Sequence, residues 1–336
     1  MDNLYTALSL AMIARRRFVI LTNSSDHLIE HFRRFVLQPC NFNVDDICEL
    51  DLMKEFKGVS EGDFIRSMVV DNIFKKVIIW RNMLKLNRSE QRRLYEFLLK
   101  LDCYDTNSSV DKDFSVELDG RRYKKPDLFV IVPVITDNCT FMYEYLKERF
   151  WFSTYYRSES SEENKEIDSS DFVQRIGQLR KKFPDVYVAP DVERYIYSLI
   201  VHIRCHRLCS VAPKSARITT RAIQDVTLLS RVLVAFQNYG GNEKLFVTPL
   251  YAKLAMKKVG YWLVTWELSK FAGLNKDTDE EKRLEISMLT GDWIGSDWKY
   301  VKAYFKQSRS RPDPSTPTGL TNTIVEDAIA TVEPPL

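Results

Sequence analysis

The sequence predicts an α/β domain with a mostly parallel sheet, followed by an all-α domain. Continuous apolar strands at 18–21, 76–80 and 127–132 alternate with segments of helical spacing. This alternation is typical of parallel strands that are covered by helices on both faces. Beyond a polar segment at 157–170, apolar residues keep helical spacing almost throughout, which predicts a second, helical domain.

Apolar periodicity predicts each element of the first domain. The predicted helices are 3–14, 26–37, 61–73, 87–101 and 141–149. Ser24 or Ser25 is the expected N-cap of the second helix. Asp119 and Gly120 between two alternating runs predict a hairpin within 114–134, and 150–155 predicts an aromatic strand. Residues 41–53 are compatible with more than one element.

Four helices make up the predicted second domain, at 171–183, 190–209, 214–238 and 248–270, with one short strand at 186–188. The polar stretch RSESSEENKEIDSS and the Pro/Ser/Thr-rich end of the chain are predicted to lack a packed core. The predicted division is an α/β core at 1–156, a flexible linker at 157–170, a helical domain at 171–270, a C-terminal extension at 271–306 and a disordered tail at 307–336.

Composition restricts the class of protein. The 336 residues include 49 basic and 46 acidic side chains, so the net charge of +3 provides no general attraction to nucleic acid or membrane. No apolar run reaches the roughly 18 residues of a membrane span. Arg15–Arg17 interrupt the apolar run near the start, so we expect no secretory leader. Six scattered cysteines indicate free thiols and an intracellular compartment, with nucleus and cytoplasm both open.

Three stretches resemble the MoxR and magnesium-chelatase branch of the AAA+ ATPases. VELDGRRYKKPDLFVIVPVITDN resembles the hairpin and sensor-1 strand of that branch, and YEYLKERFWFSTYY resembles its helix that ends in an Arg-Phe pair. YVAPDVERYIYSLIVHIR resembles the start of its helical lid. The resemblance covers roughly residues 5–265 and extends to the fungal maintenance of telomere capping protein 2 family. It implies an AAA+-like αβα sandwich followed by an all-α lid.

The resemblance places the phosphate-binding loop at the junction of the first strand and second helix, LTNSSDH. A phosphate loop needs glycines that adopt positive φ and a lysine that contacts phosphate. This junction has neither, and the carboxylate of Asp26 would repel a triphosphate. The degenerate loop consists of Thr22, Asn23, Ser24, Ser25 and Asp26. We expect a structural junction there, with a weak anion site as the alternative.

Two further catalytic positions also lack the residue types that hydrolysis needs. Trp80, Arg81 and Asn82 stand where the family has its acidic pair. An indole and a guanidinium cannot bind Mg²⁺ or act as a general base. The sensor asparagine is not at the aligned place, although polar residues follow the third strand: Thr136, Asp137 and Asn138.

The resemblance also identifies two retained arginines, Arg149 before the last core strand and Arg221 in the lid. In an active ring, such cations would stabilise charge on the transferred phosphate. The alternative is a structural ion pair, which we favour because the positions for metal and base are altered.

Two other groups of residues suggest binding sites. A helical stripe places four possible zinc ligands within one face: His202, Cys205, His206 and Cys209. Its ends lie about 10 Å apart along a helix, which is too far for one ion, so packing is the favoured interpretation. Basic runs at 15–17, 33–34, 92–93 and 121–125 would form a nucleic-acid surface only if they converged.

The sequence therefore predicts a pseudo-ATPase without ATPase activity or cofactor. We expect a scaffold that acts through unidentified protein partners, with a homo-oligomer as an open alternative, and the resemblance ties it to telomere capping. Two other functions stay open. One is a weakly nucleotide-binding or ATP-hydrolysing regulator that uses Arg149 and Arg221, and the other is a nucleic-acid-binding module.

Overall fold

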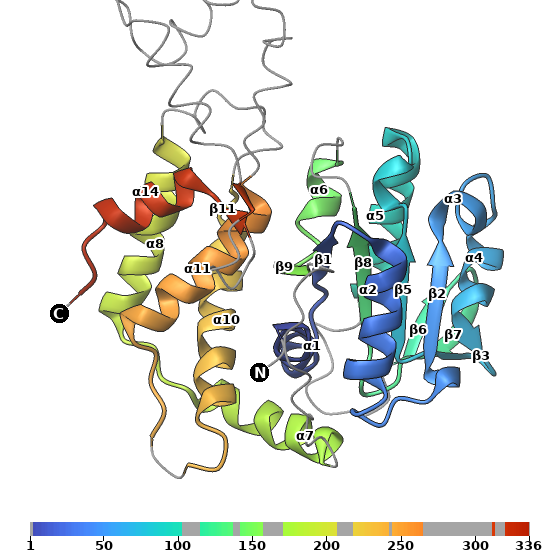
Figure 1. Ribbon diagram of the computed structural model, residues 1–336, viewed down its shortest axis with the longest axis horizontal. Helices are drawn as coiled ribbons and strands as arrows, with labels where there is room; N and C mark the ends of the chain where they lie inside the picture. Colours follow the sequence, from blue (N-terminus) through green and yellow to red (C-terminus); the bar gives the residue numbers. More distant parts are fainter. Residues whose placement is uncertain are drawn as a thin grey trace, which may run out of the picture. The chain divides into compact units, whose positions relative to one another are not determined.

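The computed structural model forms two compact units, Met1–Asp185 and Val186–Leu336. It describes residues 3–102, 115–136, 142–156, 171–206, 218–241, 244–264, 311–312 and 320–335. Each unit is considered by itself (Figure 1). None of the helices in these ranges combines the length and the apolar character that crossing a bilayer requires.

A five-stranded parallel sheet in the order β2-β5-β8-β1-β9 forms the centre of the first unit (Figure 1). Its central strands are buried almost completely, as expected for a sheet covered on both faces. The predicted AAA+-like α/β sandwich is therefore confirmed at the level of the sheet. The strands are β1 (Val19–Thr22), β2 (Ile47–Asp51), β5 (Val77–Arg81), β8 (Val130–Ile135) and β9 (Ser153–Tyr156).

Strand β2 lies in the segment that the periodicity left ambiguous. It pairs with β5 in parallel, with Glu49 opposite Ile79 and Asp51 opposite Arg81. Only five residues long, it alternates buried Leu50 with half-buried Glu49 and Asp51. This pairing places two carboxylates at the edge of the sheet beside β5.

A second sheet, in the order β3-β4-β7-β6, contains the predicted hairpin and a hairpin that the sequence analysis missed. Asp119 and Gly120 both have positive φ, which confirms the turn between β6 (Ser115–Leu118) and β7 (Arg121–Lys124). The predicted helix at 61–73 is too long, because Asp71 and Asn72 adopt positive φ between two short strands. These strands are β3 (Val69–Val70) and β4 (Ile73–Phe74).

Helices complete the first unit. A cluster of aromatic side chains packs between helices and sheet, in which Phe64 contacts the rings of Phe56, Trp80 and Phe97. The helices are α1 (Asn3–Ala14), α2 (Ser25–His31) with its π-helical continuation η1 (Phe32–Leu37), α3 (Leu52–Glu55), α4 (Glu61–Met68), α5 (Arg88–Asp102), α6 (Glu144–Lys147) and α7 (Phe172–Lys182). Three short 3₁₀ turns are η2 (Val44–Asp46), η3 (Met83–Lys85) and η4 (Phe183–Asp185).

Helix α7 belongs to the first unit, although the sequence analysis assigned it to the helical domain. The ring of Phe172 lies 6.0 Å from that of Tyr5 on α1. Arg180 donates to the carbonyl oxygen of Met12 over 2.6 Å. The first unit therefore ends at residue 185, whereas the sequence analysis ended the α/β core at residue 156.

The second unit is mainly helical. The prediction of a disordered tail at 307–336 is wrong for residues 323–331, which form helix α14. This helix packs on α8 and α11. Its apolar residues Ile324, Val325 and Ala328 are buried. Residues 271–306 of the predicted extension lie outside the described residues. The elements are α8 (Pro190–Cys205), α10 (Arg221–Gln237), α11 (Pro249–Leu263), β10 (Arg311–Pro312), β11 (Leu320–Thr321) and α14 (Thr323–Thr331).

Candidate functional site

The junction between β1 and α2 is a tight turn. Only Asn23 and Ser24 separate the end of β1 from the start of α2. The Thr22 hydroxyl accepts a hydrogen bond from the Ser24 N–H and is also 3.1 Å from the Ser24 carbonyl oxygen. Residues 22–26 all have negative φ, so the backbone does not form the concave nest of N–H groups that surrounds a phosphate. Ser24 is the N-cap residue of α2, but its side chain makes no capping bond.

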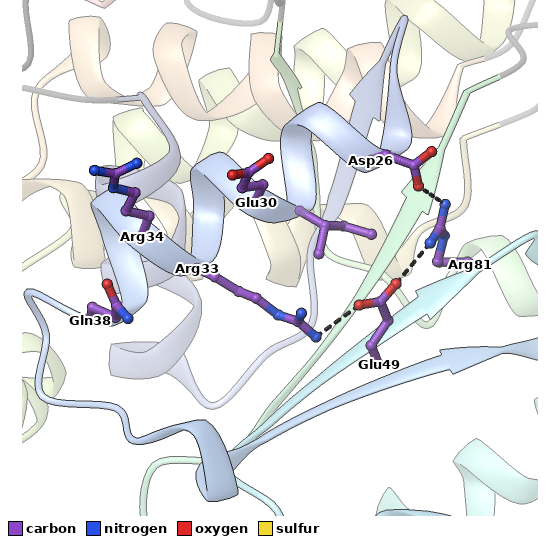
Figure 2. Close-up of a pocket in the computed structure, with 8 residues that line it drawn as sticks. Asp26, Glu30, Arg33, Arg34, Gln38, Glu49 and Arg81 are labelled. Carbon is purple, nitrogen blue, oxygen red and sulfur yellow. Dashed lines mark hydrogen bonds and ion pairs between the residues drawn. The ribbon is translucent and has the colours of Figure 1, made fainter.

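Arg81, the last residue of β5, extends towards the start of α2 (Figure 2). Its guanidinium donates to Glu49 Oε1 over 2.8 Å and to Ser25 Oγ over 3.0 Å. It also pairs with the carboxylate of Asp26. Arg81 therefore ties the sheet to the first turn of α2, the helix that follows the Asn23–Ser24 turn.

A second arginine extends this contact. Arg33 on η1 donates to Glu49 Oε2 over 2.8 Å. Asp26, Arg81, Glu49 and Arg33 thus form an ionic chain whose charges alternate in sign along its length (Figure 2). The pKa of Arg81 is lowered by burial, but its bonds to Glu49 and Asp26 outweigh this effect and leave the pKa above its ordinary value.

The ionic chain borders an open pocket of ≈ 440 Å³ on the side of α2 and η1 (Figure 2). The charges of its lining residues cancel, because three arginines face three carboxylates. A balanced lining gives no net attraction for a triphosphate. The lining residues are Asp26, Ile29, Glu30, Arg33, Arg34, Gln38, Glu49 and Arg81.

Trp80 and Asn82, on either side of Arg81, have structural contacts. The Trp80 side chain is fully buried and lies against Phe64. Asn82 adopts φ 58° and donates to Asp51 Oδ1 over 2.9 Å. Burial tends to raise the pKa of Asp51, but the hydrogen bonds from Asn82 and from the Met53 N–H lower it below its ordinary value.

Sequence reasoning missed Glu49 and Asp51, the two carboxylates on β2 that approach Arg81 and Asn82. Both are engaged, Glu49 by two arginines and Asp51 by Asn82 and the N-terminus of α3. The alternation of Glu49, Leu50 and Asp51 was the available signal for a strand. The polar residue Thr136 follows β8 and is exposed, while Asp137 and Asn138 lie outside the described residues.

The two arginines identified by the resemblance each have a partner in their own unit. Arg149 Nη1 lies 3.6 Å from Asp102 Oδ2, and its guanidinium lies 5.1 Å from the centre of the Tyr95 ring. Arg221, the first residue of α10, has its Nε 3.9 Å from Asp225 Oδ2 one turn along the helix. Both contacts are compatible with structural ion pairs.

The predicted zinc stripe is split among different contacts. His202 Nδ1 lies 3.3 Å from the Ser198 carbonyl oxygen, whereas His206 Nε2 lies 3.5 Å from Asp327 Oδ2 on α14. Cys205 is an exposed free thiol, and Cys209 lies outside the described residues. Within the described ranges, no group of three or more His, Cys, Asp or Glu side chains is arranged to hold a metal ion.

Comparison with known proteins relates the chain to a group of curated proteins by sequence. It is 32% identical over 117 residues to the Maintenance of telomere capping protein 2 of Zygosaccharomyces rouxii, which covers 33% of this chain and 32% of that protein. It is 31% identical over 131 residues to the protein of that name from Saccharomyces cerevisiae, covering 34% and 35%. The chain thus spans about a third of the length of the curated relatives it matches, and no family model matches it.

A solved structure is similar in fold. A Cytophaga hutchinsonii protein described as a candidate ATPase superposes with a TM-score of 0.50 at 13% identity, over 84% of this chain and 86% of that one. Such low identity supports the fold alone. The predicted resemblance is confirmed in both respects: the chain is a partial sequence relative of the Maintenance of telomere capping protein 2 group, and it has an ATPase-like α/β fold.

Proposed function

We propose that this protein is a pseudo-ATPase, a non-catalytic AAA+-like scaffold that acts through protein–protein contacts in telomere capping. The process comes from the name of its partial relatives. The main support for the absence of ATP hydrolysis is the ionic chain, because Arg81 lies where an active enzyme would need carboxylates around Mg²⁺.

Electrostatics supports this proposal for both parts of a Mg²⁺–nucleotide complex. The Arg81 guanidinium repels a divalent cation, while Asp26 places a carboxylate in the first turn of α2, where a phosphate would approach. Loss of a single group that stabilises the transition state costs a factor on the order of 10² to 10³ in rate. A site that lacks the loop, the metal ligands and the base is expected to have no measurable activity.

Nucleotide binding by the full-length chain tests the non-catalytic part. A fluorescent ATP analogue is titrated with and without Mg²⁺, and phosphate release is measured at saturating ATP. We expect no saturable binding in the micromolar range and no release above the buffer. Micromolar binding that requires Mg²⁺ and weakens in R81A would contradict the proposal, because it would place a working nucleotide site at the ionic chain.

The scaffold part is tested in cells. The chain is expressed in a Saccharomyces cerevisiae strain that lacks its own Maintenance of telomere capping protein 2, and telomere capping is scored. We expect the double variant N23A/S24A, which alters the degenerate loop and leaves the ionic chain intact, to support capping as well as the unmodified chain. Failure of the variant at equal protein level would indicate that the loop has a nucleotide-linked function.

Partners and self-association are measured on the same chain. Cross-linking followed by affinity purification is expected to recover defined proteins in equal amounts with the unmodified chain and N23A/S24A. Mass photometry of the purified protein gives its oligomeric state, which we propose to be independent of added ATP. A shift in assembly on addition of Mg²⁺ and ATP would favour the regulator over the scaffold.

A further inference from the structure

A second, smaller pocket lies at the amino-terminal ends of β1 and β8, opposite to the strand ends that approach the ionic chain. Its volume is ≈ 40 Å³. Four of its lining residues are basic and one is acidic. The lining consists of Arg15, Arg16, Arg17, Lys125, Pro126, Asp127, Phe129, Val130 and Ile131.

The pocket joins basic residues that are far apart in the sequence. Arg15–Arg17 follow α1, whereas Lys125 follows β7, more than a hundred residues later. The parallel strands β1 and β8 pair directly, so the segments before them lie side by side. Lys125, the last residue of the basic run 121–125, therefore lies beside the basic run Arg15–Arg17.

The backbone that presents the three arginines adopts a demanding conformation. Arg16 N–H bonds to the Ala11 carbonyl oxygen over 2.9 Å and Arg15 N–H to that of Met12 over 3.4 Å, the hydrogen-bond pattern of a Schellman motif. Arg15 has φ 52°, the left-handed region in which this motif usually has glycine. A non-glycine residue there costs about 1 kcal/mol, so the chain retains a cation at a position where glycine would be more stable.

Several basic side chains around the pocket form ion pairs or hydrogen bonds. Arg17 pairs with Asp102 at the end of α5, and Lys125 Nζ donates to the Leu101 carbonyl oxygen over 2.5 Å. Arg180 and Arg15 both contact Asp127 Oδ1, over 2.7 and 3.1 Å. These contacts stabilise the pocket walls, but the two carboxylates do not balance the basic side chains around them.

Arg16 differs from its neighbours. Within the part of the chain that the structure describes, its half-buried side chain has no ion pair or hydrogen bond. It lines the same pocket as Arg15 and Lys125. A small cavity with an excess of positive charge and an arginine that is free to donate fits a compact oxyanion.

The dimensions favour one phosphate group over a nucleic-acid backbone. A phosphomonoester carries about −1.5 to −2 charges at neutral pH and three acceptor oxygens, which suits one compact group of cations. Nucleic acid presents a row of singly charged phosphates and requires an extended basic surface. The chain's net charge of +3 provides no such domain-level excess.

We propose that the pocket lined by Arg15, Arg16 and Lys125 binds the phosphate of a phosphoserine or phosphothreonine in a partner protein. Arg16 donates to the phosphate oxygens, and Arg15 supplies charge at the mouth of the pocket. This site is independent of the degenerate nucleotide site, so it stands or falls separately from the pseudo-ATPase proposal.

Binding is measured with the full-length chain and two probes. One is inorganic phosphate, followed by calorimetry, and the other is a fluorescent alanine-rich peptide with a single phosphoserine, followed by anisotropy. R16Q removes the unpaired cation with little change of shape. R15G removes the other cation and installs the residue that the left-handed position favours, so its melting temperature should not fall. The control is R92Q on α5, whose side chain is 69% exposed and pairs with Glu96.

We expect the phosphopeptide to bind and its unphosphorylated form not to bind. R16Q and R15G should each weaken binding at least about tenfold, in line with the loss of a charge-assisted hydrogen bond, while R92Q stays within twofold. The proposal is overturned if neither probe binds at millimolar concentration, or if R16Q and R15G bind as tightly as the unmodified chain. It is also overturned if single-stranded DNA displaces the peptide with steep salt dependence and itself loses affinity in R16Q, because the ligand is then nucleic acid.

Discussion

Replacing Arg81 with alanine should destabilise the first unit by about 2 kcal/mol. Arg81 and Glu49 have side-chain exposures of 28% and 24%, so their hydrogen bond is largely shielded from water. A hydrogen bond to a charged partner in such a setting contributes about 1.5–3 kcal/mol. The bond to Asp26 adds little, because that carboxylate is 83% exposed and the median value for such pairs is about 0–1 kcal/mol.

The second partner of Glu49 limits the loss. Arg33 keeps its 2.8 Å contact with Glu49 in the R81A variant, so the carboxylate is not left without a cation. The cost should therefore stay below the roughly 3–5 kcal/mol typical of a buried charge that loses its only partner. We therefore expect R81A to cost about 2 kcal/mol, in the lower half of the range of about 1.5–3 kcal/mol for such a hydrogen bond.

Native-state hydrogen exchange of peptides from β2 and β5 measures this loss without assuming that both units unfold together. A decrease of about 2 kcal/mol corresponds to exchange about 30-fold faster. D26N and R92A serve as controls, because the replaced side chains are mostly exposed, and each should cost below about 1 kcal/mol. An R81A variant within 0.5 kcal/mol of the unmodified chain (~twofold in exchange), or a D26N variant as damaging as R81A, would refute the reasoning.

Three further predictions test the packing and charge of the fold. A Cβ at Gly260 would lie 2.9 Å from Met256 Cε and 3.0 Å from Val325 Cγ2 on α14, so G260A should lower the melting temperature. A Cβ at Gly177 would meet nothing within 4 Å, so G177A should raise the stability by up to about 1 kcal/mol. In brief iodoacetamide labelling mapped by mass spectrometry, the exposed thiol of Cys205 should react before that of Cys48, because burial raises the pKa of Cys48 to about 11. Burial tends to raise the pKa of Asp102, but the charge and hydrogen bond of Arg17, together with the charges of Lys125 and Arg149, outweigh burial and lower the pKa. The stabilisation from Asp102 is therefore complete above about pH 4 and is lost as the pH falls further. Urea unfolding should show D102N less stable than the unmodified chain at pH 7, with a smaller difference at pH 3.

Much of the fold could be predicted from apolar patterning. The strands at 18–21 and 76–80 correspond to β1 and β5 within a residue or two, because continuous apolar runs flanked by polar residues have few alternatives. The hairpin at Asp119 and Gly120 was predicted for a similar reason, since its turn requires positive φ.

The errors have physical causes. Strand β2 has a half-buried edge position with two carboxylates in five residues, which is too polar for a continuous apolar run. The predicted helix at 61–73 ends at Met68, because two positive-φ residues reverse the chain. Helix α14 follows a segment rich in proline and serine, and its short apolar face becomes informative only once α8 and α11 are placed beside it.

The residue types of the candidate site could be read from the sequence, but their arrangement could not. The missing glycines at 22–26 and the lack of an acidic pair at 80–82 were evident. Their replacement by an ionic chain was not, because Glu49 and Arg33 reach Arg81 only through tertiary structure. The convergence of Arg15–Arg17 with Lys125 likewise depended on the pairing of β1 with β8.

The alternation of charge along Asp26, Arg81, Glu49 and Arg33 also limits what a single substitution at position 81 can achieve. A carboxylate placed there would bring three acidic groups together and leave Arg33 as their only counterion among the four. Such a substitution would lose stability before it gained any affinity for Mg²⁺. Under the pseudo-ATPase proposal, building a metal site here would therefore require changes at more than one of these four positions.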